Sequence, residues 1–127
     1  MKDLKISKEL LSEVLKMEVV KHSLLNKSNK SFNVTYMPSE DSLKSSWTPV
    51  NIYEFAFKCK EWASKQKKVT LFTVEADIEN RDLYVSILYG EEHPNYKMIN
   101  FRKNNNEIGA IIKACEWILK EQNNDTK

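Results

Sequence analysis

The chain has 127 residues, of which 41% are hydrophobic and 30% are charged, with 20 Lys and Arg against 18 Asp and Glu. This length and composition fit one globular domain and exclude a disordered or collagen-like chain. The formal net charge of +2 is small for a protein that binds nucleic acid through phosphate contacts. No apolar run reaches the roughly 20 residues of a membrane-spanning helix, and no signal peptide is recognisable, so we expect a cytoplasmic protein without membrane contact.

The N-terminal third of the chain predicts one short helix followed by two strands. Ser7 is a suitable N-cap for a helix with a short apolar stripe. Residues 19–25 and 32–37 have the composition of strands, whereas the serine-rich residues 38–48 predict a surface loop. We expect residues 1–48 to be an extension that adds to the sheet formed by the rest of the chain.

A second helix is predicted to begin after Asn51. Asn51 is a good N-cap, and Glu54 stands three residues later, as in a capping box. The apolar positions that follow recur at helical spacing: Ile52, Phe55, Ala56, Cys59, Trp62 and Ala63.

Three strands are predicted after this helix, at residues 69–78, 83–89 and 96–101. In the first of them, apolar residues alternate with polar ones, so Glu75 and Asp77 are expected on the face opposite the apolar residues. Short polar connections between the three segments indicate an antiparallel meander.

The last predicted helix begins after Asn104, with Glu107 at the capping-box position. Its apolar stripe consists of Ile108, Ile111, Ile112, Cys115, Ile118 and Leu119. The polar residues 123–127 predict a frayed tail.

These elements predict an α+β fold in which an antiparallel sheet carries two amphipathic helices on one face. We expect a single domain over residues 1–122. It comprises the extension at 1–48 and a helix–meander–helix core at 49–122, with the helix–three strands–helix elements at 51–122.

The sequence carries no motif for catalysis, a metal or a cofactor. Cys59 and Cys115 lie within apolar stripes, as small hydrophobic residues do, and neither is near a second cysteine. The chain has only two glycines, which excludes glycine-rich phosphate loops. We therefore expect no enzyme, no metal site and no cofactor.

An acidic row is the first candidate binding site. Glu75, Asp77 and Glu79 are spaced by two residues, and Asp82 follows closely. Such a row is either the solvated face of a one-sided sheet or a surface that imitates nucleic-acid phosphate to a basic partner.

Spare apolar residues on the two long helices are the second candidate. Tyr53 and Phe57 lie outside the first stripe, and Ala110, Ala114 and Trp117 lie roughly opposite the second. Two interpretations stay open. These residues form a seam between helices packed side by side, or Tyr53, Phe57 and Trp117 form an exposed patch that binds another protein or a second copy.

Basic residues provide an alternative, nucleic-acid-binding hypothesis. They are Lys65, Lys67, Lys68, Arg102 and Lys103. The helix–three strands–helix order resembles that of double-stranded RNA-binding domains, which implies phosphate contacts by basic residues near the start of the last helix, where Arg102 and Lys103 stand.

Two phrases, NIYEFAFKCKEWA at 51–63 and ACEWIL at 114–119, resemble those of a family of small phage and prophage proteins that carry "NIYELAHKCKEWA" and "KACEWIL". The resemblance implies an origin in a mobile element and supplies no assigned activity and no catalytic residues. With it, we expect a non-enzymatic accessory factor that binds a host protein, including a defence enzyme. A homodimer is a further expectation, and nucleic acid is the alternative partner.

Overall fold

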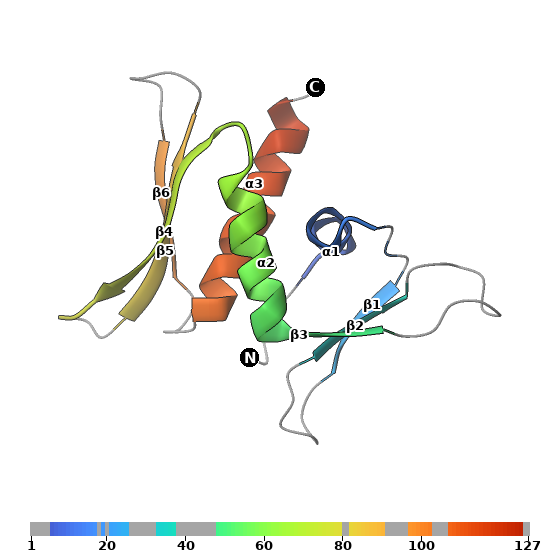
Figure 1. Cartoon of the computed structure of the whole chain (residues 1–127). Coiled ribbons are helices and arrows are strands. Elements are labelled where there is room, and N and C mark those ends of the chain that lie inside the picture. The colour runs from blue at the N-terminus through green and yellow to red at the C-terminus, as the bar shows by residue number, and fades with distance from the viewer. Residues whose placement is uncertain are drawn as a thin grey trace. The chain divides into compact units, whose positions relative to one another are not determined.

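In the computed structural model the chain has an α+β fold (Figure 1). The structure describes residues 6–17, 19, 21–25, 33–37, 48–79, 82–90, 97–102 and 107–125. The chain divides into two compact units, which we call the N-terminal unit, Ile6–Lys58, and the C-terminal unit, which contains Cys59–Lys127. The single domain expected over 1–122 stays a prediction.

The N-terminal unit begins with helix α1, Lys8–Leu15, whose cap agrees with the sequence prediction. The backbone N–H of Leu10 donates to Oγ of Ser7 at 3.0 Å, which satisfies one of the unpaired N–H groups at the start of the helix. The helix ends at Lys16, which has a left-handed backbone with φ of 57°.

Three strands form a sheet within the N-terminal unit: β1 (Lys21–Leu25), β2 (Asn33–Met37) and β3 (Thr48–Asn51), antiparallel and in the order β1-β2-β3. The expectation that this segment would extend the sheet of residues 69–101 was wrong, because its strands make a separate sheet. The sequence predicted a loop up to residue 48 and no strand at the position of β3, which contains Pro49. A proline is tolerated here because β3 is an edge strand that pairs only with β2.

Helix α2, Ile52–Ser64, has the N-cap that the sequence predicts. Oδ1 of Asn51 accepts hydrogen bonds from the backbone N–H of Tyr53 at 2.8 Å and of Glu54 at 3.4 Å. Every residue of the predicted apolar stripe of α2 is buried. The boundary between the two units falls within this helix, after Lys58.

The C-terminal unit contains the predicted antiparallel meander, with strands β4 (Val69–Asp77), β5 (Asp82–Tyr89) and β6 (Lys97–Arg102) in the order β4-β5-β6. Each strand lies within one residue of its predicted bounds. Strand β4 ends at Asp77, so Ile78 and Glu79 lie in the turn that follows it.

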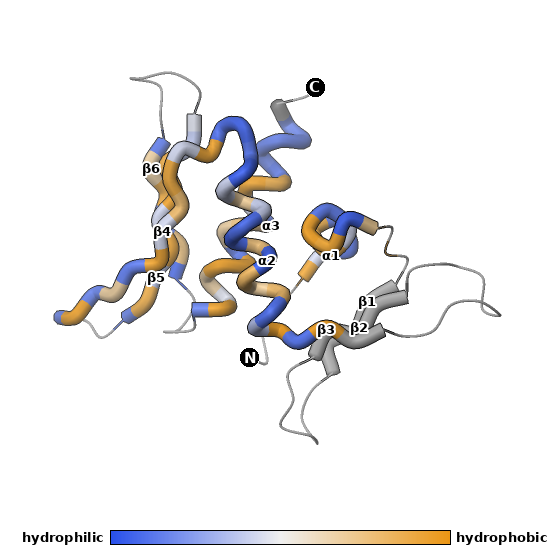
Figure 2. Tube along the Cα trace, viewed as in Figure 1, coloured by the Kyte–Doolittle hydropathy of each residue, from blue (hydrophilic) through white to orange (hydrophobic). Residues whose placement is uncertain are grey.

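Helix α3, Glu107–Asp125, packs on β5 and β6. The predicted cap Asn104 lies outside the described residues. The helix continues to Asp125, where the sequence predicted a frayed tail from residue 123, and its C-terminal end is hydrophilic in Figure 2. Figure 1 shows α3 beside the C-terminal half of α2 on one face of the β4–β6 sheet, as predicted. Across these helices Nε2 of Gln122 donates to Oε1 of Gln66, just after α2, at 2.7 Å.

Candidate protein-binding surface

One face of the β4–β5–β6 sheet is the helix face, which packs against α3. In central strand β5, the side chains of Val85 and Ile87 are fully buried, and Tyr89 is 5% exposed. Because side chains alternate along a strand, these three share one face. The register places Phe101 of β6 beside Val85, on the same face.

Trp117 of α3 lies on this helix face. The centroid of its half-buried ring is 5.1 Å from that of Tyr89, with the rings nearly perpendicular, and 6.0 Å from that of Phe101. Cys115, on a different side of α3, faces α2, where its Sγ lies 3.5 Å from the backbone oxygen of Cys59. Trp117 therefore packs on the sheet, rather than in a seam between helices or in an exposed patch. A ring held between two others is a poor anchor for a partner.

The other face of the sheet, which we call the outer face, is ordered in rows by the strand register. Each row runs from β4 through β5 to β6. We name them the apolar row (Leu71, Leu88, Met98), the neutral row (Thr73, Ser86, Asn100) and the charged row (Glu75, Tyr84, Arg102). An acidic pair, Asp77 and Asp82, lies beyond the charged row.

The charged row is organised around Tyr84. The guanidinium carbon of Arg102 lies 4.5 Å from the centre of the Tyr84 ring, a cation–π contact. Arg102 also forms an ion pair with Asp82, which directs it along the sheet surface. Partial burial raises the pKa of Tyr84 most. The negative charge of Glu75 and a hydrogen bond with Glu75 raise this pKa further, whereas the charge of Arg102 lowers it. Tyr84 therefore stays a neutral phenol between a carboxylate and a guanidinium.

The other end of the outer face exposes aliphatic side chains. Leu71 is 45% exposed and Met98 is 60% exposed, although both lie in strands of the sheet, where Leu71 follows a register shift in β4 after Val69. Oγ of Ser86 lies 3.2 Å from Sδ of Met98, so the methionine reaches toward the middle of the face. The outer face thus combines an accessible apolar end with a charged end.

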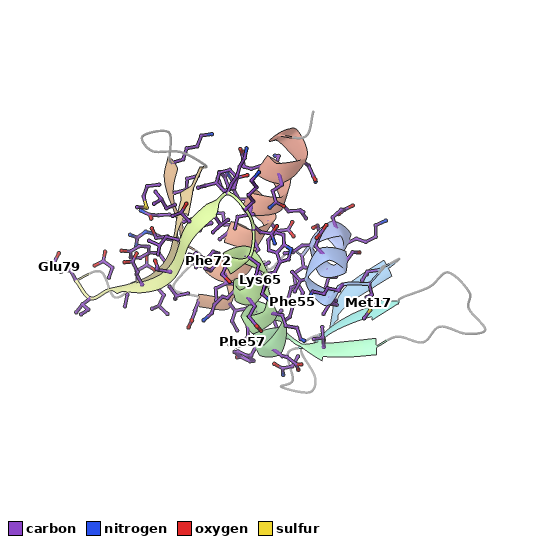
Figure 3. The ribbon with its side chains drawn as sticks, turned by 45° about the horizontal axis from the view of Figure 1, so that its top comes forward. Met17, Phe55, Phe57, Lys65, Phe72 and Glu79 are labelled. Atoms are coloured by element: carbon purple, nitrogen blue, oxygen red, sulfur yellow. The ribbon has the colours of Figure 1, made fainter. Side chains whose placement is uncertain are left out.

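The predicted acidic row is only partly assembled. Glu75 and Asp77 lie on the outer face as expected, and Asp82 is the cross-strand partner of Asp77. Glu79 lies in the turn beyond β4, as the predicted strand bounds of 69–78 implied, so it does not continue the row along the sheet, and Figure 3 shows it far from Lys65. Arg102, which had been grouped with the basic residues, ion-pairs with Asp82 and lowers the negative charge of this surface.

Tyr53 and Phe57 are exposed on α2, at 56% and 59%. They are four residues apart, which places them on one side of the helix. Figure 3 shows Phe57 on the other side of α2 from the buried Phe55. They belong to the N-terminal unit and Trp117 to the C-terminal unit. A patch formed by all three aromatic residues stays a prediction.

The basic residues of the nucleic-acid hypothesis fall into two places. Lys65, Lys67 and Lys68 precede Val69, which pairs with Tyr89. Arg102 pairs with Tyr84, five residues away along β5 or about 17 Å. Lys103 lies outside the described residues. The structure therefore separates Arg102 from the three lysines.

The two cysteines are buried and close to each other. Burial raises the pKa of the Cys59 thiol far above its usual range, and a hydrogen bond with Cys115 adds to the effect. A protonated, inaccessible thiol is not a nucleophile. In the described part of the chain, no three His, Cys, Asp or Glu side chains are grouped to hold a metal ion.

Sequence reasoning had missed most of the outer face. The alternation in LYVSILY places Tyr84, Ser86 and Leu88 on one side of β5, which was a usable signal. Their neighbours on β4 and β6 depend on the strand register, for which the sequence carries no local signal.

No helix within the described ranges is both long enough and apolar enough to cross a membrane.

Comparisons of the chain with protein-family models, with curated proteins and with solved structures find no match.

Proposed function

We propose that this chain is a small non-enzymatic protein that acts by binding another protein, with the outer face of the β4–β5–β6 sheet as its binding surface. One observation carries the proposal: exposed Leu71 and Met98 share a sheet face with the charged row. Apolar side chains that are next to oriented charges give a surface both binding free energy and specificity.

The charges of the outer face favour a partner with cationic side chains. Glu75, Asp77 and Asp82 supply three carboxylates, against the one guanidinium of Arg102. Complementary charge speeds the encounter with such a partner. The resemblance to phage and prophage proteins supports an accessory role in a mobile element, with a host protein as the target.

Nucleic acid is the less favoured partner. Phosphate binding requires basic residues on a common surface, whereas Arg102 lies among carboxylates and away from Lys65, Lys67 and Lys68. Among the described residues, only these three lysines, which are close together in the sequence, are grouped as the nucleic-acid hypothesis requires.

Site-specific photo-cross-linking in the natural host cell tests the proposal. A photoreactive amino acid replaces Met98 on the outer face. In the matched control it replaces Lys113, which is exposed on α3. We expect a cross-linked protein from position 98 that is absent from position 113. Glu75→Lys, introduced with the probe at 98, should weaken the product because it reverses a charge of the surface.

Two results would contradict the proposal. A product at position 98 that nuclease removes would indicate nucleic acid as the partner. Equal labelling from positions 98 and 113 would mean that the outer face has no specific partner.

A further inference from the structure

On the outer face, the charged row and the apolar row are each complementary to the same row read in the opposite direction, from β6 to β4. In the charged row, β4 contributes the carboxylate of Glu75 and β6 contributes the guanidinium of Arg102, with Tyr84 between them. The apolar row carries Leu71 at the β4 end and Met98 at the β6 end. If such a row is placed over a second one with β4 and β6 exchanged, a carboxylate therefore faces a guanidinium in the charged row, and two apolar side chains face each other in the apolar row.

A two-fold axis parallel to β5 brings each row against its own reverse. Such an axis, lying between two sheets packed face to face, places β4 of one copy over β6 of the other. It leaves every row at the same height along the strands. Sheets pack in this way about 10 Å apart, with strand directions within about 30° of each other. A two-fold interface of this kind uses the same surface patch on both copies.

We infer that the outer face binds a second copy of this chain about this axis. The inference rests on the proposed function, because it assigns the same surface to a protein partner, which is a second copy in place of a host protein. Glu75 of each copy meets Arg102 of the second copy, so the dimer has two intermolecular ion pairs. Leu71 of each copy meets Met98 of the second copy, which removes the exposed apolar end of both faces from water.

The charges select this axis over a perpendicular one. An axis running across the strands through the neutral row would place Leu71 over Glu75 of the second copy, and Met98 over Arg102, burying charges against apolar groups. With the axis parallel to β5, Asp82 lies near Asp82 of the second copy. Its charge is balanced by Arg102 of its own chain, whose guanidinium has further N–H donors for Glu75 of the second copy.

Charge exchange on the purified full chain tests the inference. Sedimentation equilibrium and light scattering measure self-association of the wild type, of Glu75→Arg, of Arg102→Glu and of a 1:1 mixture of the two variants. The wild type should dimerise. Each variant alone faces two like-charge contacts, so its dissociation constant should rise about tenfold or more. The mixture should regain dimers, because a heterodimer forms two ion pairs, one between Arg102 and Glu75 as in the wild type and one with the two charges exchanged.

The mixture separates an intermolecular effect from a change inside one chain, since each molecule carries one substitution only. Lys113→Glu, an exposed change on α3, is the control and should dimerise like the wild type. Circular dichroism shows whether each variant is folded. Light scattering of Leu71→Ser, an uncharged change in the apolar row, supplies a second reading and should show weaker self-association.

A monomeric wild type at about 100 μM, the range of weak interfaces, would overturn the inference. A mixture as dissociated as its components would overturn it as well. If the wild type is monomeric while the probe at position 98 cross-links a different protein in cells, the inference fails and the proposed function stands. If the outer face gives neither a dimer nor a cross-linked protein, both fail.

Discussion

Trp117→Ala is expected to destabilise the protein by about 3–4 kcal/mol. A Trp side chain in a protein interior removes roughly 150–250 Å² from water, and at about 25 cal/mol/Å² the lower figure corresponds to about 4 kcal/mol as an upper bound. Trp117 is half-buried, which reduces this value, whereas its ring contacts with Tyr89 and Phe101 each add about 0.5–1.5 kcal/mol. The result lies in the range found for removal of large core side chains.

Urea unfolding followed by far-UV circular dichroism measures this loss. A double-mutant cycle with Phe101→Leu isolates the contact between the two rings, and its coupling energy should be about 0.5–1.5 kcal/mol. Lys113→Ala, on an exposed part of the same helix, should change stability by less than about 0.5 kcal/mol. A loss below 1 kcal/mol for Trp117→Ala, with no coupling to Phe101, would refute the packing of α3 on the sheet described above.

Three further predictions concern the α2 cap, the buried thiols and the charged row. Asn51→Ala removes the acceptor for two backbone N–H groups of α2 and should cost about 1 kcal/mol in urea unfolding, whereas Asn51→Asp should retain most of the stability. The folded-state pKa of Cys59 lies above the unfolded value of about 8.5, so its contribution to stability is complete below that pH and declines as the pH rises above it. Unfolding free energies at pH 7 and pH 9.5 should therefore differ less in Cys59→Ala than in the wild type, and an equal difference would contradict this account. Ultraviolet absorbance titration should show that Tyr84 ionises at a higher pH than an exposed tyrosine, and Glu75→Gln should lower the pKa of Tyr84.

The helix starts and the alternation of β4 could be predicted because their causes are local. The caps at Ser7 and Asn51 bond to N–H groups two or three residues away, so the signal lies within one turn of sequence. Glu75 and Asp77 follow from the two-residue period of a strand. Strand β3 was missed because a proline such as Pro49 normally marks a loop. No neighbouring residue in the sequence indicates that β3 lies at the edge of its sheet, where it pairs only with β2 and tolerates a proline.

The outer face could not be predicted because it depends on register and on which elements pack together. Tyr84 lies between Glu75 and Arg102 only because of cross-strand pairing, and these residues are 9 and 18 positions from Tyr84 in the sequence. For α3, the apolar pattern indicated which residues are buried, but it did not indicate which strands or helices they pack against. Ala110 and Cys115 are both fully buried on different sides of the helix, so the pattern alone could not indicate that Trp117 faces the sheet.

The difference between the short connections of the meander and the distant contact of α2 with α3 has a consequence for folding kinetics. Asp77 pairs with Asp82, five positions away, whereas Cys59 and Cys115 are 56 positions apart. Loop-closure entropy makes the longer closure costlier by about 2 kcal/mol. The β4–β5 hairpin should therefore form before α3 reaches α2. Substitutions in the hairpin should mainly slow refolding, and substitutions where the two helices meet should mainly speed unfolding.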